Sequence, residues 1–288
     1  KAAHSGWQRY EMEQDQHSIQ RLALAGELRR AIENGELVLH YQPKIDVASG
    51  RVVGAEALCR WQHPTLGLVM PDDFVPMAEH TGLITPLTKT VLNIALAQIA
   101  RWRDAGNRMS VAVNLSARSF LDSQLLDELP GMLEAWGVDP ALLELEITES
   151  MIVGDPERAR AVLGRLNDLG VTLAIDDFGT GYSSLAYLRA LPVDEIKIDR
   201  SFVMEMAGTD SGETIVRSII DLAHNLGLRA VAEGVEDQGL LTRLTELGCD
   251  VAQGYYISRP LPVARFEQWM ASYPLRTTWL GESRAIAV

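Results

Sequence analysis

The sequence has few cysteines, no long apolar run and a shortage of basic residues, and each shortage excludes a class of protein. Its 288 residues include only two cysteines, Cys59 and Cys249, whose context lacks metal-site spacing and favours a reduced, cytosolic location. No apolar run reaches the roughly 18 residues of a membrane-spanning helix, so we expect no membrane contact for these residues. The net charge of −13 argues against adhesion to DNA duplexes, RNA duplexes or anionic lipid.

The remaining composition is that of a globular protein, with 47% hydrophobic and 23% charged residues. The chain opens "KAAHSGWQRY", without a signal peptide or an initiator methionine, and we expect a piece of a longer protein. Residues 10–35 predict one amphipathic helix with Leu22, Leu28 and Ile32 inward. That helix is either a plain packing element or a signalling linker from an upstream domain.

Short runs of β-branched and apolar residues alternate with segments of helical periodicity. One helical segment is 85–106, and another is 212–227, with Ile215, Ile219, Leu222 and Leu226 on one stripe. Eight strands alternating with helices predict the α/β class, specifically a TIM-like (β/α)8 barrel. The predicted strands are 37–47, 51–61, 110–116, 143–148, 171–177, 194–200, 228–234 and 250–256.

The first two predicted strands are joined by residues 48–50 alone. A parallel pair needs a crossover connection of roughly a dozen residues or more. These two strands must therefore form an antiparallel hairpin. We expect a barrel whose first strand runs against the others.

Polar residues interrupt the predicted strands near their carboxyl ends, where barrels of this kind carry their chemistry. Buried carboxylates repel one another unless a cation compensates, and one lysine cannot satisfy five of them. Because all the candidate ligands offer oxygen, they favour Mg²⁺ or Mn²⁺ over zinc, and the adjacent aspartates allow two ions. The residues are Glu56, Asn114, Glu146, Asp176, Asp177, Lys197, Glu233 and Gln253.

Two parts of this pattern leave alternatives open. Lys197 is either a structural counter-ion or a group that orients or helps to deprotonate a water. In "GTGYSS", Gly179 and Gly181 either form a tight turn before a helix capped by Ser183 or Ser184, or hinge a gating loop that aligns the two aspartates.

A series of ordered motifs resembles the EAL-domain family. They are "EAL" (56–58) within "GAEALCRW", "NLS", "LEITE", "DDFGTGYSS", "IKID", "AEGVE" and "QGYYISRPLP", and the resemblance covers about residues 20–275. It implies the same barrel with an antiparallel first strand. We expect a linker at 1–18, similar to the tail of a GGDEF domain through "GWQRYEMEQ", then an EAL barrel at 19–275 and a tail at 276–288.

The resemblance also assigns roles to residues. It implies metal ligation by Glu56, Asn114, Glu146, Asp176, Asp177 and Glu233, with Glu233 as ligand or general base and Lys197 at the attacking water. Glu149 would hold the loop that contains Gly179, Thr180 and Gly181, and Arg60 would contact a substrate phosphate. Positions near the substrate would be Gln42, Leu58, Asp199, Glu236 and Gln253.

The activity implied is hydrolysis of cyclic di-GMP to linear pGpG with two Mg²⁺ or Mn²⁺ ions, by a homodimer that associates near the loop after the fifth strand. Two other functions compete with this one. A receptor would bind cyclic di-GMP without turnover, although the complete ligand set argues against it. A metal-dependent enolising barrel enzyme would have no use for Arg60 or the "DDFG" run.

Overall fold

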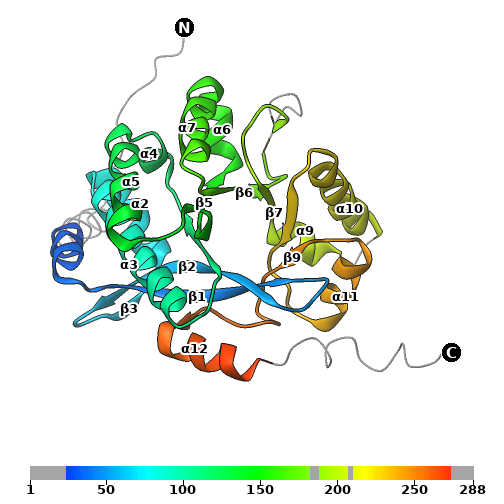
Figure 1. The fold of residues 1–288 in the computed structure, drawn as a ribbon, viewed down its shortest axis with the longest axis horizontal. Helices are drawn as coiled ribbons and strands as arrows, with labels where there is room; N and C mark the ends of the chain where they lie inside the picture. Colours follow the sequence, from blue (N-terminus) through cyan, green and yellow to red (C-terminus); the bar gives the residue numbers. More distant parts are fainter. Residues whose placement is uncertain (1–23, 182–187, 207–209, 274–288) are drawn as a thin grey trace, which may run out of the picture.

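The structure, a computed structural model, describes residues 24–181, 188–206 and 210–273, and the predicted linker at 1–18 and tail at 276–288 lie outside them. Eight described strands close into a barrel in the order β1-β9-β8-β7-β6-β5-β4-β2, with β2 returning to β1 (Figure 1). They are β1 (Leu37–Asp46), β2 (Val52–His63), β4 (Ser110–Asn114), β5 (Leu143–Thr148), β6 (Thr172–Phe178), β7 (Glu195–Ile198), β8 (Arg229–Ala232) and β9 (Val251–Ala252).

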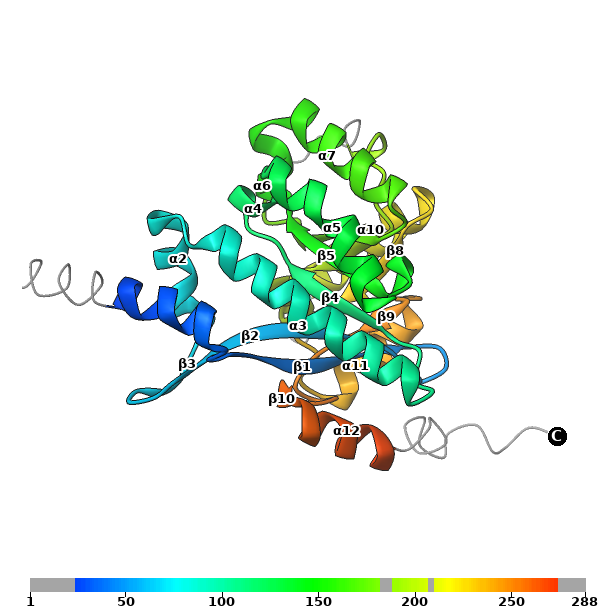
Figure 2. The ribbon, with the colours of Figure 1, turned by 60° about the vertical axis from the view of Figure 1, so that its left-hand side comes forward.

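The first strand runs against its neighbours, as the short connection predicts. β1 pairs antiparallel with β2, placing Gln42 opposite Glu56, and antiparallel with β9, placing Ile45 opposite Ala252. The other pairs around the barrel are parallel. Two short strands, β3 (Gly67–Val69) and β10 (Leu261–Pro262), pair with β2 and β1, and the β2–β3 ribbon extends beyond the barrel (Figure 2).

Helices surround the barrel on its outer side (Figure 1). Residues 24–34 are helical and precede β1, and Pro140–Leu142 form a 3₁₀ turn. None of the described helices is long and apolar enough to span a bilayer. The remaining helices are α2 (Pro71–Thr81), α3 (Ile84–Asp104), α4 (Ala117–Phe120), α5 (Ser123–Trp136), α6 (Glu149–Gly154), α7 (Pro156–Asp168), α9 (Arg200–Glu205), α10 (Asp210–Asn225), α11 (Gln238–Glu246) and α12 (Val263–Ser272).

The predicted stripe of α10 was wrong at its first residue. Ile215 is 38% exposed, whereas Val216 and Ala223 are fully buried. The buried side of α10 is therefore formed by Val216, Ile219, Ile220 and Ala223, and the predicted Leu222 and Leu226 are partly buried beside it. In the helix at 24–34, Leu28 is buried and Ile32 is partly buried as predicted, while Leu22 lies outside the described residues.

The antiparallel first strand changes how the barrel is covered. Because a hairpin joins β1 to β2, no described helix connects these two strands, and α12 from the end of the chain packs on β1 together with α3 (Figure 2). Phe266 of α12 packs against Tyr41 of β1 and Trp102 of α3, with ring centroids 5.9 and 5.3 Å away. This aromatic cluster fastens α12 to the barrel.

We predict that Phe266→Ala lowers the free energy of unfolding by about 3–5 kcal/mol, because a fully buried aromatic leaves a cavity that its neighbours cannot fill. Urea unfolding followed by tryptophan fluorescence measures it. The matched control on the same helix is the exposed Gln268→Ala, which should cost less than about 0.5 kcal/mol. Equal costs for the two variants would contradict the packing role of Phe266.

Candidate active site

Most of the polar strand-end residues meet at the mouth formed by the carboxyl ends of the parallel strands. They surround a cavity of about 240 Å³. Arg200 and Tyr255 also line it, and sequence reasoning missed both: the predicted strands 194–200 and 250–256 include them, whereas β7 and β9 end before them. Predicted members of the lining are Gln42, Glu56, Leu58, Asn114, Asp176, Glu233, Glu236 and Gln253. A second, mostly apolar hollow of about 340 Å³ between β2, α2 and α3 shares only Leu58 and Asn114 with them.

Amide side chains hold Glu56 at one side of this mouth. Asn114 Nδ2 donates to Glu56 Oε1 at 2.7 Å, and Gln253 Nε2 donates to Glu56 Oε2 at 2.5 Å. Gln253 Nε2 also donates to Gln42 Oε1 at 3.0 Å, so β1, β2, β4 and the residue after β9 are linked here. Burial acts to raise the pKa of Glu56, but attraction to Lys197 and these hydrogen bonds outweigh it and lower the pKa. Glu56 is therefore held as a carboxylate.

Lys197 lies at the centre of the site, buried on β7. Its Nζ is 2.7 Å from Glu233 Oε1, 2.8 Å from Glu146 Oε2 and 3.1 Å from Asp176 Oδ1. Neither Lys197 Nζ nor either Glu146 carboxylate oxygen has a hydrogen-bond partner with good geometry. The charges therefore lie close together without directional bonds to fix them.

These surroundings perturb the carboxyl groups. Burial, together with repulsion from Glu56 and Asp176, raises the pKa of Glu146 well above its usual range despite the attraction of Lys197. Burial and repulsion from the same two groups likewise raise the pKa of Glu233 to about 7. Asp177 is shifted upward as well, because burial and its neighbour Asp176 raise its pKa. Without a further cation, protonation is the available way to relieve this repulsion.

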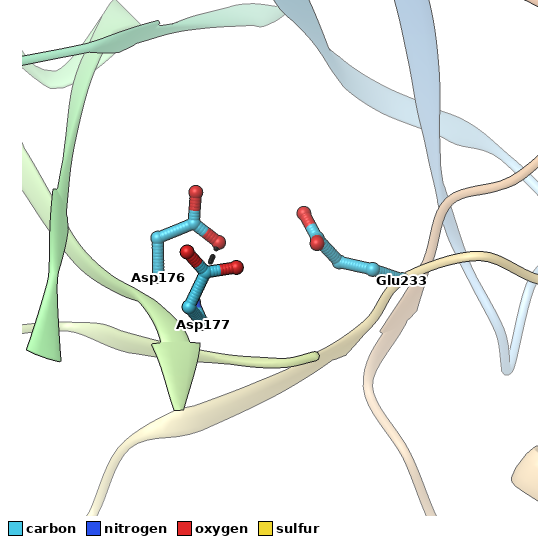
Figure 3. A group of neighbouring side chains, drawn as sticks. All are labelled: Asp176, Asp177 and Glu233. Atoms are coloured by element: carbon cyan, nitrogen blue, oxygen red, sulfur yellow. Dashed lines mark hydrogen bonds between the residues drawn. The ribbon is translucent and has the colours of Figure 1, made fainter. Parts of the chain in front are cut away.

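A β-bulge directs the two adjacent aspartates into the mouth. Ile175 lies opposite Ile196 and Phe178 opposite Ile198, so β6 has one extra residue between these pairs. Asp177 takes up the bulge in the left-handed region at φ 53°, which costs a non-glycine residue about 1 kcal/mol or more. Carboxylate oxygens of Asp176, Asp177 and Glu233 lie within 4.8 Å of one another, with Glu233 facing the pair across the opening (Figure 3).

The loop after β6 is held by a buried glutamate at the start of α6. Glu149 Oε2 accepts hydrogen bonds from Gly179 N at 2.9 Å and Gly181 N at 3.3 Å, and Thr180 Oγ1 donates to Asp177 O at 2.8 Å. Gly179 has φ 98°, and a Cβ on Gly181 would lie 2.9 Å from Glu149 Oε1. Glycine is thus needed at both positions for this arrangement. The predicted caps Ser183 and Ser184 lie outside the described residues.

Three predicted substrate-side residues lie at the edge of the cavity or beyond it. Arg60 is on the same face of β2 as Glu56, and its guanidinium donates to Cys59 O at 2.8 Å without lining the cavity. Asp199 caps α9 by accepting from Ser201 N at 3.0 Å. Glu236 lines the cavity and pairs with Arg200 at 2.5 Å.

Lys44, Glu144 and Glu195 form a second buried group that sequence reasoning missed. Each lies two residues before or after a predicted member: Lys44 follows Gln42, Glu144 precedes Glu146, and Glu195 precedes Lys197. Strand alternation places such residues on the same face, one layer further into the barrel. That spacing was the signal available in the sequence.

The mouth fits divalent cations. Glu56, Glu146, Asp176, Asp177 and Glu233 surround one described ammonium, Lys197, which leaves a formal excess of four negative charges that two divalent ions would balance. The two Glu146 oxygens are buried beside lysine ammonium groups but make no hydrogen bonds, so they fit metal ligands. All-oxygen donors select a hard ion.

Comparisons with known proteins agree with this geometry. A family model described as EAL domain matches residues 25–260. The chain is 42% identical over 269 residues to the bifunctional diguanylate cyclase/cyclic di-GMP phosphodiesterase MucR of Pseudomonas aeruginosa (93% of this chain, 39% of the relative). It is 45% identical over 257 residues to the cyclic di-GMP phosphodiesterase NbdA of the same organism (89% and 33%).

A solved structure named "PaMucR Phosphodiesterase, c-di-GMP complex" is also similar, with 44% identity and a TM-score of 0.81 over 86% of this chain and 99% of that one. Fold and site together define a TIM-like barrel with a carboxylate-rich mouth. The chain belongs to the EAL domain family. It spans less than half the length of the curated relatives named above.

We predict that Glu149→Ala speeds amide hydrogen exchange at Gly179 and Gly181 by on the order of tenfold or more, because both N–H groups lose their acceptor. Exchange followed by NMR or mass spectrometry measures it. The neighbouring Ser150→Ala serves as the control and should leave both amides protected. Unchanged protection in Glu149→Ala would show that the loop is held by other contacts.

Proposed function

We propose that this chain hydrolyses cyclic di-GMP to linear pGpG, with Mg²⁺ or Mn²⁺ at two positions in the mouth. The observation that carries the proposal is the excess of carboxylates around Lys197, among which the fully buried Glu146 has no hydrogen bond to either oxygen. The relatives named for this activity support the choice of substrate. The negative charge of cyclic di-GMP is compatible with an acidic protein when cations lie between them.

The two ions would be held by six residues: Glu56, Asn114, Glu146, Asp176, Asp177 and Glu233. When bound, they supply a lowered pKa for an attacking water and charge stabilisation for the phosphate in an in-line displacement. Asp176 and Asp177 suit two ions because the bulge brings both side chains to the mouth while their neighbours on the strand stay buried.

Lys197 and Glu233 are placed to orient the attacking water and to accept its proton. Their charged atoms lie 2.7 Å apart, so a water beside them would be oriented by the ammonium and face the carboxylate. The raised pKa of Glu233, about 7, suits a general base near neutral pH. Glu233 thus has two roles open to it, as a ligand and as a base.

The remaining residues bind the substrate in this proposal. Arg60 adds a fixed positive charge on the Glu56 side of the mouth for a phosphate. Leu58, Gln42, Gln253 and Glu236 line the cavity and offer an apolar surface and hydrogen-bonding groups to the nucleotide. Asp199 caps the N-terminus of α9, whose first residue, Arg200, lines the cavity.

We predict metal-dependent conversion of cyclic di-GMP to pGpG by the purified chain, resolved by chromatography after incubation with Mg²⁺ or Mn²⁺. EDTA should abolish conversion, and restoring Mn²⁺ should recover it. Glu56→Ala and Asp176→Ala should each reduce turnover by on the order of 10³-fold or more, because each removes a ligand of the metal ions that would stabilise the charged transition state. Near-normal turnover in either variant would rule out this metal assignment.

A matched control for the two variants is Glu79→Ala, which changes an exposed residue of α2 outside the carboxylate mouth and should retain turnover.

Binding of cyclic di-GMP without conversion would show a receptor instead of an enzyme. Isothermal titration with cyclic di-GMP in the presence of Ca²⁺, which also takes oxygen ligands, measures binding, and chromatography of the same sample measures conversion.

We further propose that the chain works as a homodimer joined near the loop after β6, the fifth strand of the barrel, which α6 holds through Glu149. Val153 on α6 is 48% exposed, although Glu149 on the same helix is buried at the loop beside the site. Val153→Arg should shift the sedimentation profile from dimer towards monomer, because a charge would be buried at the interface. A wild-type chain that sediments as a monomer and is fully active would contradict the importance of a dimer.

A further inference from the structure

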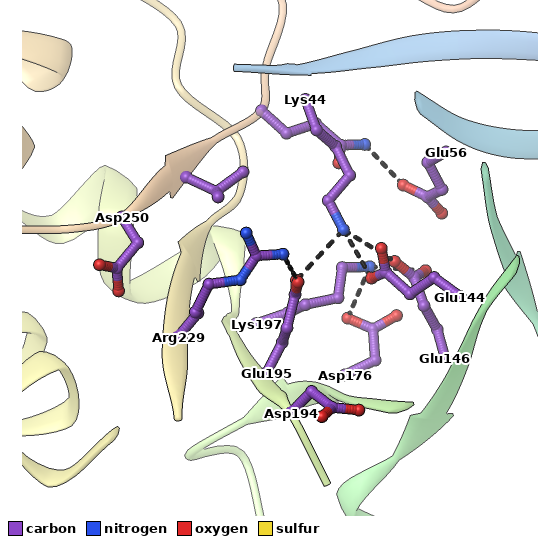
Figure 4. A network of polar contacts seen from close by, with 12 residues as sticks. Lys44, Glu56, Glu144, Glu146, Asp176, Asp194, Glu195, Lys197, Arg229 and Asp250 are labelled. Carbon is purple, nitrogen blue, oxygen red and sulfur yellow. Dashed lines mark hydrogen bonds and ion pairs between the residues drawn. The ribbon is translucent and has the colours of Figure 1, made fainter. Parts of the chain in front are cut away.

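A second ionic layer lies directly beneath the candidate metal site. Lys44 Nζ on β1 is 2.6 Å from Glu144 Oε1 on β5 and 3.4 Å from Glu195 Oε2 on β7 (Figure 4). Arg229 on β8 pairs with the other side of Glu195 and is 53% exposed. We call Lys44, Glu144, Glu195 and Arg229 the floor. Its two cations match its two carboxylates, unlike the mouth above it.

Local sequence makes room for a lysine here. Lys44 lies opposite Gly54 in the hairpin, and Gly54 lies beside Ser110 of β4. A Cβ on Gly54 would come within 2.4 Å of Ser110 Oγ, so this part of the barrel wall is restricted to small residues. The wall therefore leaves space for the long Lys44 side chain to cross towards β5 and β7.

The floor and the mouth meet at Glu146. Lys197 Nζ lies 2.8 Å from Glu146 Oε2, and Lys44 Nζ lies 3.9 Å from Glu146 Oε1. The two ammonium groups thus lie near different oxygens of the Glu146 carboxylate, and they repel each other. Since Lys197 makes no bond of good hydrogen-bond geometry, its position depends on the balance of these charges.

We propose that Lys44 is a positioning residue that keeps the Lys197 ammonium in the mouth. Lys44 does so by neutralising Glu144 and Glu195, which would otherwise attract Lys197 downwards, and by repelling it from below. The proposal rests on the proposed function insofar as Lys197 acts on the attacking water. Lys44 itself does not line the cavity.

Removing the Lys44 charge would leave Glu144 without its nearest partner in a dry interior, where an unpaired carboxylate is unfavourable. Lys197 is the neighbouring described ammonium and would move towards the floor. Glu146, Asp176 and Glu233 would then keep their places as metal ligands but lose the ammonium beside the water. Turnover should fall while the affinity for metal does not.

The test compares the wild-type chain with Lys44→Met, Glu144→Gln and the double variant Lys44→Met/Glu144→Gln. Methionine preserves much of the stem volume, and the Glu144→Gln change removes a floor charge that Lys44 neutralises. In Lys44→Met, kcat should fall on the order of tenfold or more, with KM for cyclic di-GMP and the Kd for Mn²⁺ unchanged or tighter. The double variant should recover the kcat of Glu144→Gln, because Glu195 still has Arg229.

A purely structural role gives a different pattern. Distortion of β1 would also displace Gln42, so KM would rise and Mn²⁺ binding, measured by calorimetry on the metal-free proteins, would weaken. Either of those changes in Lys44→Met, or a double variant no better than Lys44→Met, would overturn the proposal.

The calorimetric measurement needs no turnover, so it also separates the two hypotheses. If the wild-type chain binds Mn²⁺ but does not convert cyclic di-GMP, the proposed function fails. The Lys44 proposal then stands if Lys44→Met binds Mn²⁺ at least as tightly as wild type, and falls if binding weakens. Thermal unfolding of each variant confirms that the folded proteins are being compared.

Discussion

Mutual repulsion among buried carboxylates is the constraint on which the rest of this structure depends. Five carboxylates, three of them buried, share one mouth with the ammonium of Lys197, and one, Glu146, is fully buried without a hydrogen bond. An arrangement of this kind is unfavourable for a protein alone, because desolvation and like charge both oppose ionisation. In the proposed function, divalent ions bound at the mouth would offset this repulsion.

The fold serves this site through two departures from a regular barrel. The antiparallel β1 brings Gln42 opposite Glu56 and introduces Lys44 from the reverse direction, so that its ammonium reaches the floor. The bulge in β6 lets two successive aspartates face one opening, which a regular strand forbids. The left-handed Asp177 and the loop clamped by Glu149 follow from that bulge. Local strain is thus concentrated at the mouth, while the surrounding core is conventionally apolar.

Much of this organisation could be predicted from the sequence. The hairpin followed from a connection too short for a crossover, and the polar mouth followed from residues that interrupt apolar strands. The bulge could not be predicted, because "AIDDFG" is equally compatible with a regular strand. Only the backbone pairing of β6 with β7 shows the extra residue. The floor was missed although Glu144 and Glu195 each lie two residues before a predicted site residue. A polar residue early in a strand also suits an exposed strand end, so the sequence did not single these residues out. For α10 the helical period was predicted from the sequence, but the side that faces the core was predicted wrongly at Ile215, which is exposed.

Two divalent cations would balance the formal negative charge of the mouth. The most direct test of this proposal is a crystal structure of the chain with Mn²⁺, using anomalous scattering to locate the ions. The account predicts two anomalous peaks in the mouth, in contact with Glu146 and with the Asp176–Asp177 pair, and Lys197 still beside Glu233. No peak there at saturating Mn²⁺, with Glu146 paired only to Lys197, would contradict it.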